Sequence, residues 1–266
     1  MSKLLRIPSD GLEIVAETFG DGPALVFAHG LSGNRHGVRR QLAALADRYR
    51  IVIFDQRGHG DSSPVTDPAL FTPEAMAEDM AAVMDALNID KAIVGGESMG
   101  ADTTLTFALR HPERVQALLL TVPAFGDAVN SEAPRMIEMA GRIQTLGLPA
   151  FLAAAREVWR DQFFWPEDVI EVVGGTFASH QSDSLATAMR TVMNWTMPDM
   201  EPLRALRCPT CVIGWPDDPL HPLALAERIA ALIPRAQLEI MPTLPEVFHN
   251  PGLVGAIYGR YLSQIH

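Results

Sequence analysis

The chain has 266 residues, of which 48% are hydrophobic and 20% are charged, and its formal net charge is −11. This composition is that of a globular protein of one or two domains, and a single α/β domain often reaches this length. An acidic chain without a basic patch is not expected to bind nucleic acid. No apolar run approaches the ~18 residues that span a membrane, and the N-terminus turns polar too early for a secretory signal. We therefore expect a soluble, cytoplasmic protein.

Short apolar runs alternate with amphipathic stretches along most of the chain. Candidate strands cover residues 12–18, 24–28, 51–55, 92–95, 117–122, 211–214 and 238–241. Candidate helices cover residues 38–48, 73–87, 99–110, 222–232 and 251–265. Most of the strands are apolar throughout, as expected when helices cover both faces of a parallel sheet. This alternation predicts right-handed crossovers and a doubly wound α/β sheet.

One region breaks the alternation. Residues 125–202 contain no convincing strand, but they hold three of the four tryptophans and several methionines. We expect a helical insertion with a small core of its own, which can also serve as a lid over a pocket. Within it, Gly174-Gly175 is interpreted as a helix break.

The two cysteines, Cys208 and Cys211, form a C-x-x-C motif. Redox dithiols lie where a strand ends and a helix begins, because the helix N-terminus stabilises the thiolate. This pair instead opens an apolar strand, so we interpret both cysteines as structural. The sequence has no H-E-x-x-H motif, no paired histidines at helical spacing and no calcium-binding loop, so no metal or other cofactor is expected.

The central motif is G-x-S-x-G at residues 96–100, between a predicted strand and a predicted helix. That context is typical of a nucleophile elbow, a turn so sharp that Gly96 and Gly100 cannot carry side chains. The turn would lift Ser98 above the sheet at the N-terminus of a helix, where backbone N–H groups can stabilise an oxyanion. We therefore expect Ser98 to be a nucleophile and Met99 to supply one oxyanion donor.

Two further loops agree with this interpretation. His29-Gly30 follows the predicted strand 24–28, where a second oxyanion donor is expected, and the N–H of Leu31 would supply it. Residues 55–62 follow the next strand and are rich in glycine and charge. We interpret them as a tight, hydrogen-bonded structural loop.

These segments, in this order, resemble the α/β-hydrolase superfamily over nearly the whole chain. The matching segments are His29-Gly30, the loop 55–62, the elbow 96–100 and residues 214–222. The resemblance implies an eight-stranded, mostly parallel sheet, with a helical cap inserted after the sixth strand. It assigns residues 1–124 and 203–266 to the core and residues 125–202 to the cap. It also implies a catalytic triad of serine, acid and histidine.

In this superfamily the acid follows the seventh strand, commonly four residues before a proline. Asp218 lies four residues before Pro222 and is the candidate, and its neighbour Asp217 is the second choice. Asp127, after the sixth strand, is a less favoured position that some relatives use. The carboxylate would orient the imidazole and stabilise its charged form.

The histidine departs from the superfamily pattern. Members usually carry it a few residues after the eighth strand, about seven residues before a helix-starting proline, but that position here is Leu244. His249 lies directly before Asn250-Pro251 and would need a rebuilt loop to act as the base. His221, three residues after Asp218, is the competing candidate, and the third alternative is that no conventional base exists. We interpret four other histidines as surface or structural residues, namely His36, His59, His111 and His180.

The sequence therefore predicts a serine hydrolase that acts on a small ester, lactone or related acyl compound with an apolar part. Because the histidine is atypical, two other hypotheses stay open. The protein could perform C–C bond cleavage or other non-hydrolytic chemistry in the same oxyanion hole, or it could be a binding protein that has lost turnover. The sequence predicts neither the substrate nor the oligomeric state.

Overall fold

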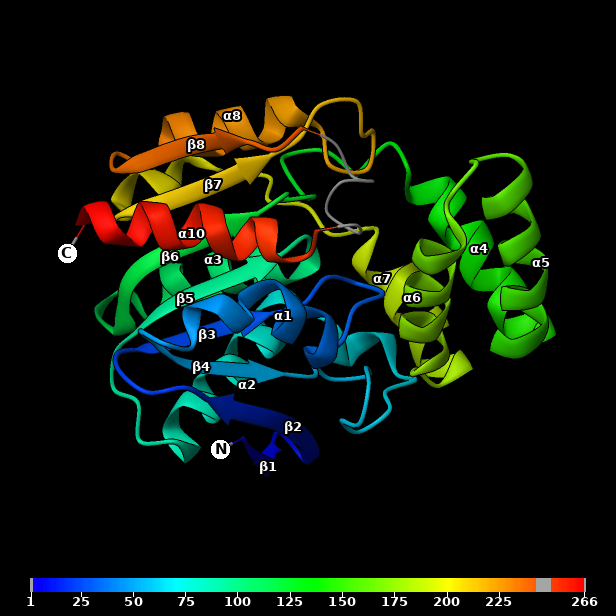
Figure 1. Ribbon diagram of the computed structural model, residues 1–266, viewed down its shortest axis with the longest axis horizontal. Coiled ribbons are helices and arrows are strands. Elements are labelled where there is room, and N and C mark those ends of the chain that lie inside the picture. The colour runs from blue at the N-terminus through cyan, green and yellow to red at the C-terminus, as the bar shows by residue number, and fades with distance from the viewer. Residues whose placement is uncertain (1, 243–249, 266) are drawn as a thin grey trace.

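An eight-stranded sheet forms the centre of the computed structural model, which describes residues 2–242 and 250–265 (Figure 1). The strand order is β1-β2-β4-β3-β5-β6-β7-β8. β1 and β2 pair in antiparallel fashion, as do β2 and β4, whereas every pair from β4 to β8 is parallel. The strands are β1 (Lys3–Ser9), β2 (Leu12–Phe19), β3 (Ala24–Ala28), β4 (Arg50–Phe54), β5 (Ala92–Glu97), β6 (Val115–Thr121), β7 (Thr210–Gly214) and β8 (Ala236–Ile240).

Helices cover both faces of this sheet because successive residues of each strand point to opposite faces. On one face Val26, Val52 and Val94 pack against α2 (Pro73–Ala86), α3 (Met99–Arg110) and α8 (Leu223–Leu232). On the other face Phe27 and Ile53 pack against α1 (Arg35–Leu42) and α10 (Gly252–Ile265). The predicted doubly wound, mostly parallel sheet is therefore confirmed.

Two elements differ from the sequence prediction. β1 has no counterpart among the predicted strands, because it is an edge strand with a single buried residue, Ile7, and neither a continuous apolar run nor a clean alternation. α1 begins at Arg35, three residues before the predicted start, since the Asn34 side chain accepts a hydrogen bond from the Gly37 N–H and caps the helix there. It ends at Leu42, six residues before the predicted end, and a 3₁₀ helix (Ala43–Leu45) follows it. None of the described helices is long and apolar enough to cross a membrane.

Four helices fill most of the segment between β6 and β7: α4 (Ala133–Leu146), α5 (Leu148–Asp161), α6 (Glu167–Ala178) and α7 (Ser182–Val192). They lie together beyond the end of the sheet to which β7 points (Figure 1). We refer to residues 125–202 as the helical segment. Its core includes Met136, Met189 and Trp195, and this cluster is continuous with Leu31 and Met99 of the sheet domain.

The interpretation of Gly174-Gly175 as a helix break is wrong, because α6 runs through both residues. A Cβ atom on Gly174 would lie 2.8 Å from Nη2 of Arg156. Gly174 therefore allows the guanidinium of α5 to approach the α6 backbone. This packing between two helices is not visible in the local sequence.

Candidate active site

The strand β5 and the helix α3 are joined by a strained turn centred on Ser98. Ser98 has φ +52° and ψ −116°, a backbone conformation that non-glycine residues rarely adopt. A Cβ atom on Gly96 would lie 2.0 Å from the Gly100 oxygen, and one on Gly100 would lie 2.3 Å from the Ala28 oxygen. Only glycine fits at either position, so the two glycines of the motif permit the turn that lifts Ser98 to the end of the sheet.

The loop after β7 brings an imidazole and a carboxylate to this serine. His221 Nε2 lies 2.9 Å from Ser98 Oγ, and His221 Nδ1 lies 2.7 Å from Asp218 Oδ2. The side chains of His221 and Asp218 are 11% and 15% exposed. With Nδ1–H donated to the carboxylate, Nε2 is left to accept the hydroxyl proton. This is the relation of nucleophile, base and orienting acid that acyl transfer requires.

Trp215, the first residue after β7, holds the acid in place. Its indole Nε1–H donates to Asp218 Oδ2 over 2.8 Å, and the Leu220 N–H donates to Asp218 Oδ1 over 2.9 Å. Burial alone would raise the pKa of Asp218, but the bond from His221, the His221 charge and these two donors lower that pKa to about 2. Asp218 is therefore an ionised acceptor at neutral pH. Trp215 was not among the predicted site residues, although its place directly after a strand is a signal that could have indicated it.

The other candidate acids lie apart from this chain of hydrogen bonds. Asp217 is exposed, with φ +61°. Asp127 is also exposed and pairs over 2.7 Å with Arg228. His249, the competing candidate for the base, lies outside the described residues. Of the predicted acids and bases that the structure describes, Asp218 and His221 are the two that it brings to Ser98.

The expected oxyanion donors lie beside the nucleophile. Met99 is buried and is the first residue of α3, directly after the N-cap residue Ser98. Its N–H is therefore one of the N–H groups that have no partner within the helix. Leu31 is buried in the loop after β3. A Cβ atom on the preceding Gly30 would lie 3.4 Å from the Ser98 Cβ, so this loop approaches the serine closely.

The loop 55–62 is held by hydrogen bonds, as its sequence suggests. The fully buried Asp55 accepts from the Arg35 N–H at 2.7 Å and from the Asp61 N–H at 3.0 Å, and it also forms an ion pair with the Arg35 guanidinium. Buried Arg57 binds both oxygens of Asp79, at 2.7 and 2.9 Å. These paired charges give the loop a fixed shape beneath the site.

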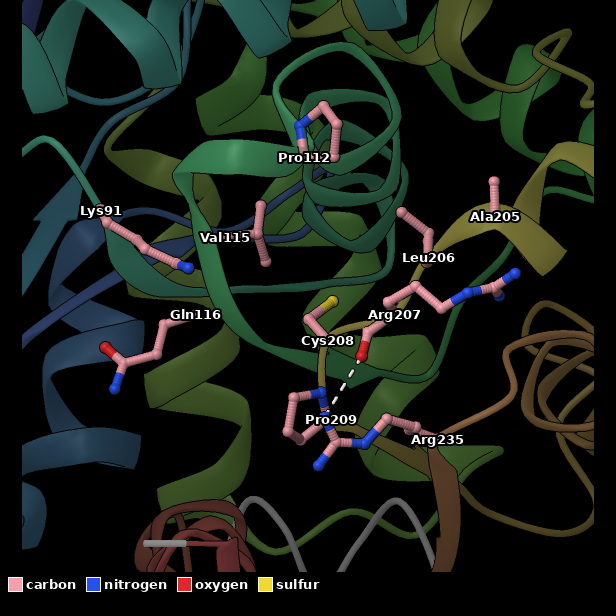
Figure 2. A pocket seen from close by; sticks show the side chains of 10 residues that line it. All are labelled: Lys91, Pro112, Val115, Gln116, Ala205, Leu206, Arg207, Cys208, Pro209 and Arg235. Atoms are coloured by element: carbon pink, nitrogen blue, oxygen red, sulfur yellow. Dashed lines mark hydrogen bonds between the residues drawn. The ribbon is translucent and has the colours of Figure 1, made fainter.

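A cavity of about 350 Å³ lies where strands β5 to β8 begin, at the opposite end of the strands from Ser98. Figure 2 shows the side chains that line it. Ten residues line it, namely Lys91, Pro112, Val115, Gln116, Ala205, Leu206, Arg207, Cys208, Pro209 and Arg235. Burial raises the pKa of the Cys208 thiol, and it raises that of Cys211 to about 12. Neither thiol is poised as a thiolate, in agreement with a structural interpretation of the C-x-x-C motif.

The chain is similar in sequence and in fold to known proteins. Residues 23–146 match the family described as the α/β hydrolase fold. The chain is 28% identical over 261 residues to a protein of Caulobacter sp. (strain K31) whose name proposes a carbamate hydrolase, covering 90% of this chain and 93% of that one. It is 27% identical over 229 residues to 3-oxoadipate enol-lactonase 2 of Acinetobacter baylyi, covering 84% and 83% of the two chains. A thermophilic esterase from Thermogutta terrifontis superposes with a TM-score of 0.82 at 25% identity, over 99% of each chain.

The sequence match and the structural match agree with the architecture. The matched residues 23–146 contain the loop after β3 and the elbow at Ser98. The superposition covers 99% of the chain and so includes the sheet and both layers of helices. The elbow follows β5, which lies in the middle of the parallel strands from β4 to β8. The chain is therefore an enzyme of the α/β-hydrolase superfamily.

Proposed function

We propose that the protein is a serine hydrolase that cleaves a small ester, lactone or related acyl compound through an acyl-enzyme on Ser98. The observation that carries this proposal is the continuous chain of hydrogen bonds from Ser98 Oγ to His221 Nε2, at 2.9 Å, and from His221 Nδ1 to Asp218 Oδ2, at 2.7 Å. A serine hydroxyl is a weak nucleophile until an adjacent base takes its proton. His221 is that base in this proposal, and Asp218 orients it.

In the first half of the reaction, Ser98 Oγ attacks the carbonyl carbon of the substrate while its proton passes to His221 Nε2. The imidazolium that forms is stabilised by Asp218, whose low pKa of about 2 keeps it ionised. The carbonyl oxygen becomes an oxyanion, which the N–H groups of Leu31 and Met99 stabilise. Each such donor is typically worth ~2.7–4 kcal/mol.

His221 then returns the proton to the leaving oxygen, and the bond between the acyl carbon and that oxygen breaks, which leaves the acyl-enzyme. In the second half, a water molecule attacks the acyl carbon as His221 takes one of its protons. The bond between the acyl carbon and Ser98 Oγ then breaks as His221 gives this proton to Oγ, which releases the acid and restores the Ser98 hydroxyl. His221 thus serves as base and acid in turn, which requires a ring nitrogen that can both gain and lose a proton.

The helical segment serves as a cap in this proposal, and its apolar core favours a substrate with an apolar part. Leu31 and Met99 share one apolar cluster with Met136, Met189 and Trp195 of the helical segment. The names of the three relatives described above support the same range of substrates, since they describe a carbamate hydrolase, an enol-lactonase and an esterase. Each of these names refers to hydrolysis at an acyl carbon.

The decisive experiment replaces the nucleophile. Ser98→Ala should lower the hydrolysis of p-nitrophenyl acetate by about 10⁴-fold or more, since the residues of a triad act as a unit. A fluorophosphonate probe should label the wild-type protein on Ser98, as read by peptide mass spectrometry, and should leave Ser98→Ala unlabelled. Ser263→Ala, an exposed serine on α10, is the matched control. Unchanged hydrolysis by Ser98→Ala would contradict the proposal.

A further inference from the structure

Three buried histidines surround the loop that follows β3. His29 lies in that loop, His59 in the loop 55–62, and His180 between α6 and α7 of the helical segment. They are only 1%, 1% and 7% exposed. Their rings meet edge to face, with centroids 5.1 Å apart for His29 and His59 and 5.3 Å apart for His59 and His180. The mechanism proposed above uses none of these imidazoles.

Each of the three rings contacts a different carbonyl group of the same loop, and the carbonyls are consecutive. His29 Nδ1 lies 2.7 Å from the Gly30 oxygen, His59 Nε2 lies 2.6 Å from the Leu31 oxygen, and His180 Nε2 lies 3.1 Å from the Ser32 oxygen. Three imidazoles that arrive from different parts of the chain therefore hold the backbone on both sides of the Leu31 N–H.

The outer two rings have a defined tautomer. Burial lowers the pKa of all three histidines, that of His180 to about 3, so the rings are neutral at neutral pH. His29 Nε2 accepts the Gln56 N–H at 2.9 Å, and His180 Nδ1 accepts the Gly60 N–H at 3.1 Å. The opposite nitrogen of each ring therefore carries the hydrogen and donates it to the loop carbonyl. His59 lies between two carbonyls, with Nδ1 2.9 Å from the Arg57 oxygen, and its shorter contact is with Leu31.

Holding these carbonyls also fixes the N–H groups of the loop. The Gly30 carbonyl and the Leu31 N–H belong to one planar trans peptide unit, so the two groups point in opposite directions. The Gly30 oxygen is held twice, by His29 and by the Gly33 N–H at 2.8 Å. The contacts to Leu31 and Ser32 fix the next two peptide planes. A rotation of the peptide unit that carries the Leu31 N–H would break the bonds to the Gly30 oxygen.

Of the three rings, His180 alone comes from the helical segment. We infer that His180 is a positioning residue that couples the seating of the helical segment to the direction of the oxyanion donor at Leu31. This inference rests on the proposed function of Ser98 and Leu31. A neighbouring bond, from Asn34 Nδ2 to Ser179 Oγ at 2.9 Å, also joins the helical segment to the sheet domain but does not hold a carbonyl of this loop. It therefore provides the matched control.

The test compares His180→Phe, which keeps a ring but loses both hydrogen bonds, with His180→Gln, which retains an amide donor and acceptor. Both kcat and KM are measured with p-nitrophenyl acetate, and inhibition is measured with a trifluoromethyl ketone, whose adduct places an oxyanion in the hole. His180→Phe should lower kcat about tenfold or more with KM nearly unchanged, a fraction of what deleting a whole donor costs. Inhibitor affinity should fall by a similar factor. His180→Gln should recover most of both, and Ser179→Ala should stay within about twofold of wild type.

Two results would overturn the coupling. One is a His180→Phe protein with the same kcat as Ser179→Ala, and the other is a loss confined to KM, which would indicate a role in substrate binding alone. Circular dichroism and urea unfolding verify that each variant is folded, and His180→Asn, whose shorter amide does not reach the carbonyl, replaces His180→Phe if that variant fails to fold. Failure of the proposed function is distinct, because it would show as full hydrolysis by Ser98→Ala in the otherwise unchanged protein.

Discussion

The molecule uses its imidazoles in two opposite ways, one in the loop after β7 and the other around the loop after β3. His221 lies between a hydroxyl and a carboxylate, and its side chain is 11% exposed. His29, His59 and His180 are buried and contact backbone carbonyl groups. In the proposed mechanism the first ring takes the Ser98 proton, and the Asp218 carboxylate compensates the new charge. The second set stays neutral at neutral pH, because burial lowers the pKa of all three rings.

The partners and the burial of a histidine, rather than its residue type, therefore determine whether it can transfer protons or orient the backbone. Asp218 is kept ionised by its own donors, with a pKa of about 2. In contrast, the pKa of His180 falls to about 3 chiefly through burial and the neighbouring His59. Four experiments test this distinction between the two groups of histidines.

The largest effect is expected from removing the ring that transfers protons. His221→Ala should lower kcat/KM for p-nitrophenyl acetate by about 10⁴-fold or more, because Ser98 then has no base. His249→Ala, assayed in parallel, should stay within about twofold of wild type. If His249→Ala shows the large loss and His221→Ala does not, the base has been assigned to the wrong histidine.

A smaller but still large effect is expected from neutralising the acid. Asp218→Asn should lower kcat by about 10²- to 10⁴-fold, because an amide neither stabilises the imidazolium nor fixes the required tautomer. Asp217→Asn changes the adjacent exposed carboxylate and serves as the control. Equal losses in both variants would mean that the loop as a whole, rather than the Asp218 carboxylate, is responsible.

The buried histidines should reveal themselves in the pH dependence of stability. Below pH ~6.5 the unfolded chain protonates these histidines whereas the folded protein does not, so the free energy of unfolding falls as pH falls. His180, with its folded pKa of about 3, contributes a slope of up to ~1.4 kcal/mol per pH unit between pH ~6.5 and 3. Urea unfolding at a series of pH values should therefore give a shallower slope for His180→Gln than for wild type. An unchanged slope would show that His180 is not held neutral, and the exposed His36→Gln is the control.

The smallest effect is expected at the residue that supports the acid. Trp215→Phe keeps an aromatic ring but removes the indole N–H that donates to Asp218 over 2.8 Å. Loss of one hydrogen bond to a charged group costs about 1.5–3 kcal/mol, so kcat should fall about 10- to 100-fold. A pH–rate profile should show no new base, because His221 itself is intact. A loss as large as that of Asp218→Asn would mean that Trp215 positions the entire loop.

Local motifs allowed much of this arrangement to be predicted. The glycines around Ser98 are required by one turn, and the apolar runs of the parallel strands follow from burial on both faces, so both the elbow and the sheet can be read from short segments. The edge strand β1 lacks that pattern and was missed. The choice between His221 and His249 could not be made, because it depends on the path of a loop in space.

The role of His180 could not be read from the sequence either. It lies 148 residues from Ser32, the residue whose carbonyl it contacts, and 120 residues from Gly60. No local spacing or periodicity indicates a contact of that range, because it arises only when the helical segment packs against the sheet domain. Such contacts depend on the tertiary structure, and here they connect residues that sequence analysis had considered separately.

Asp218 and His221 are three residues apart in the chain, and Trp215 precedes Asp218 by three more. The acid, the proposed base and the supporting indole therefore lie in one short loop, and the geometry among them is set within that loop rather than by the assembly of distant strands. Such a unit is modular: residues 215–222 could be exchanged as a block with another member of the superfamily and carry their proton-transfer chemistry with them. With His221 as the base, the proposed mechanism requires no proton transfer from the chain between β8 and α10.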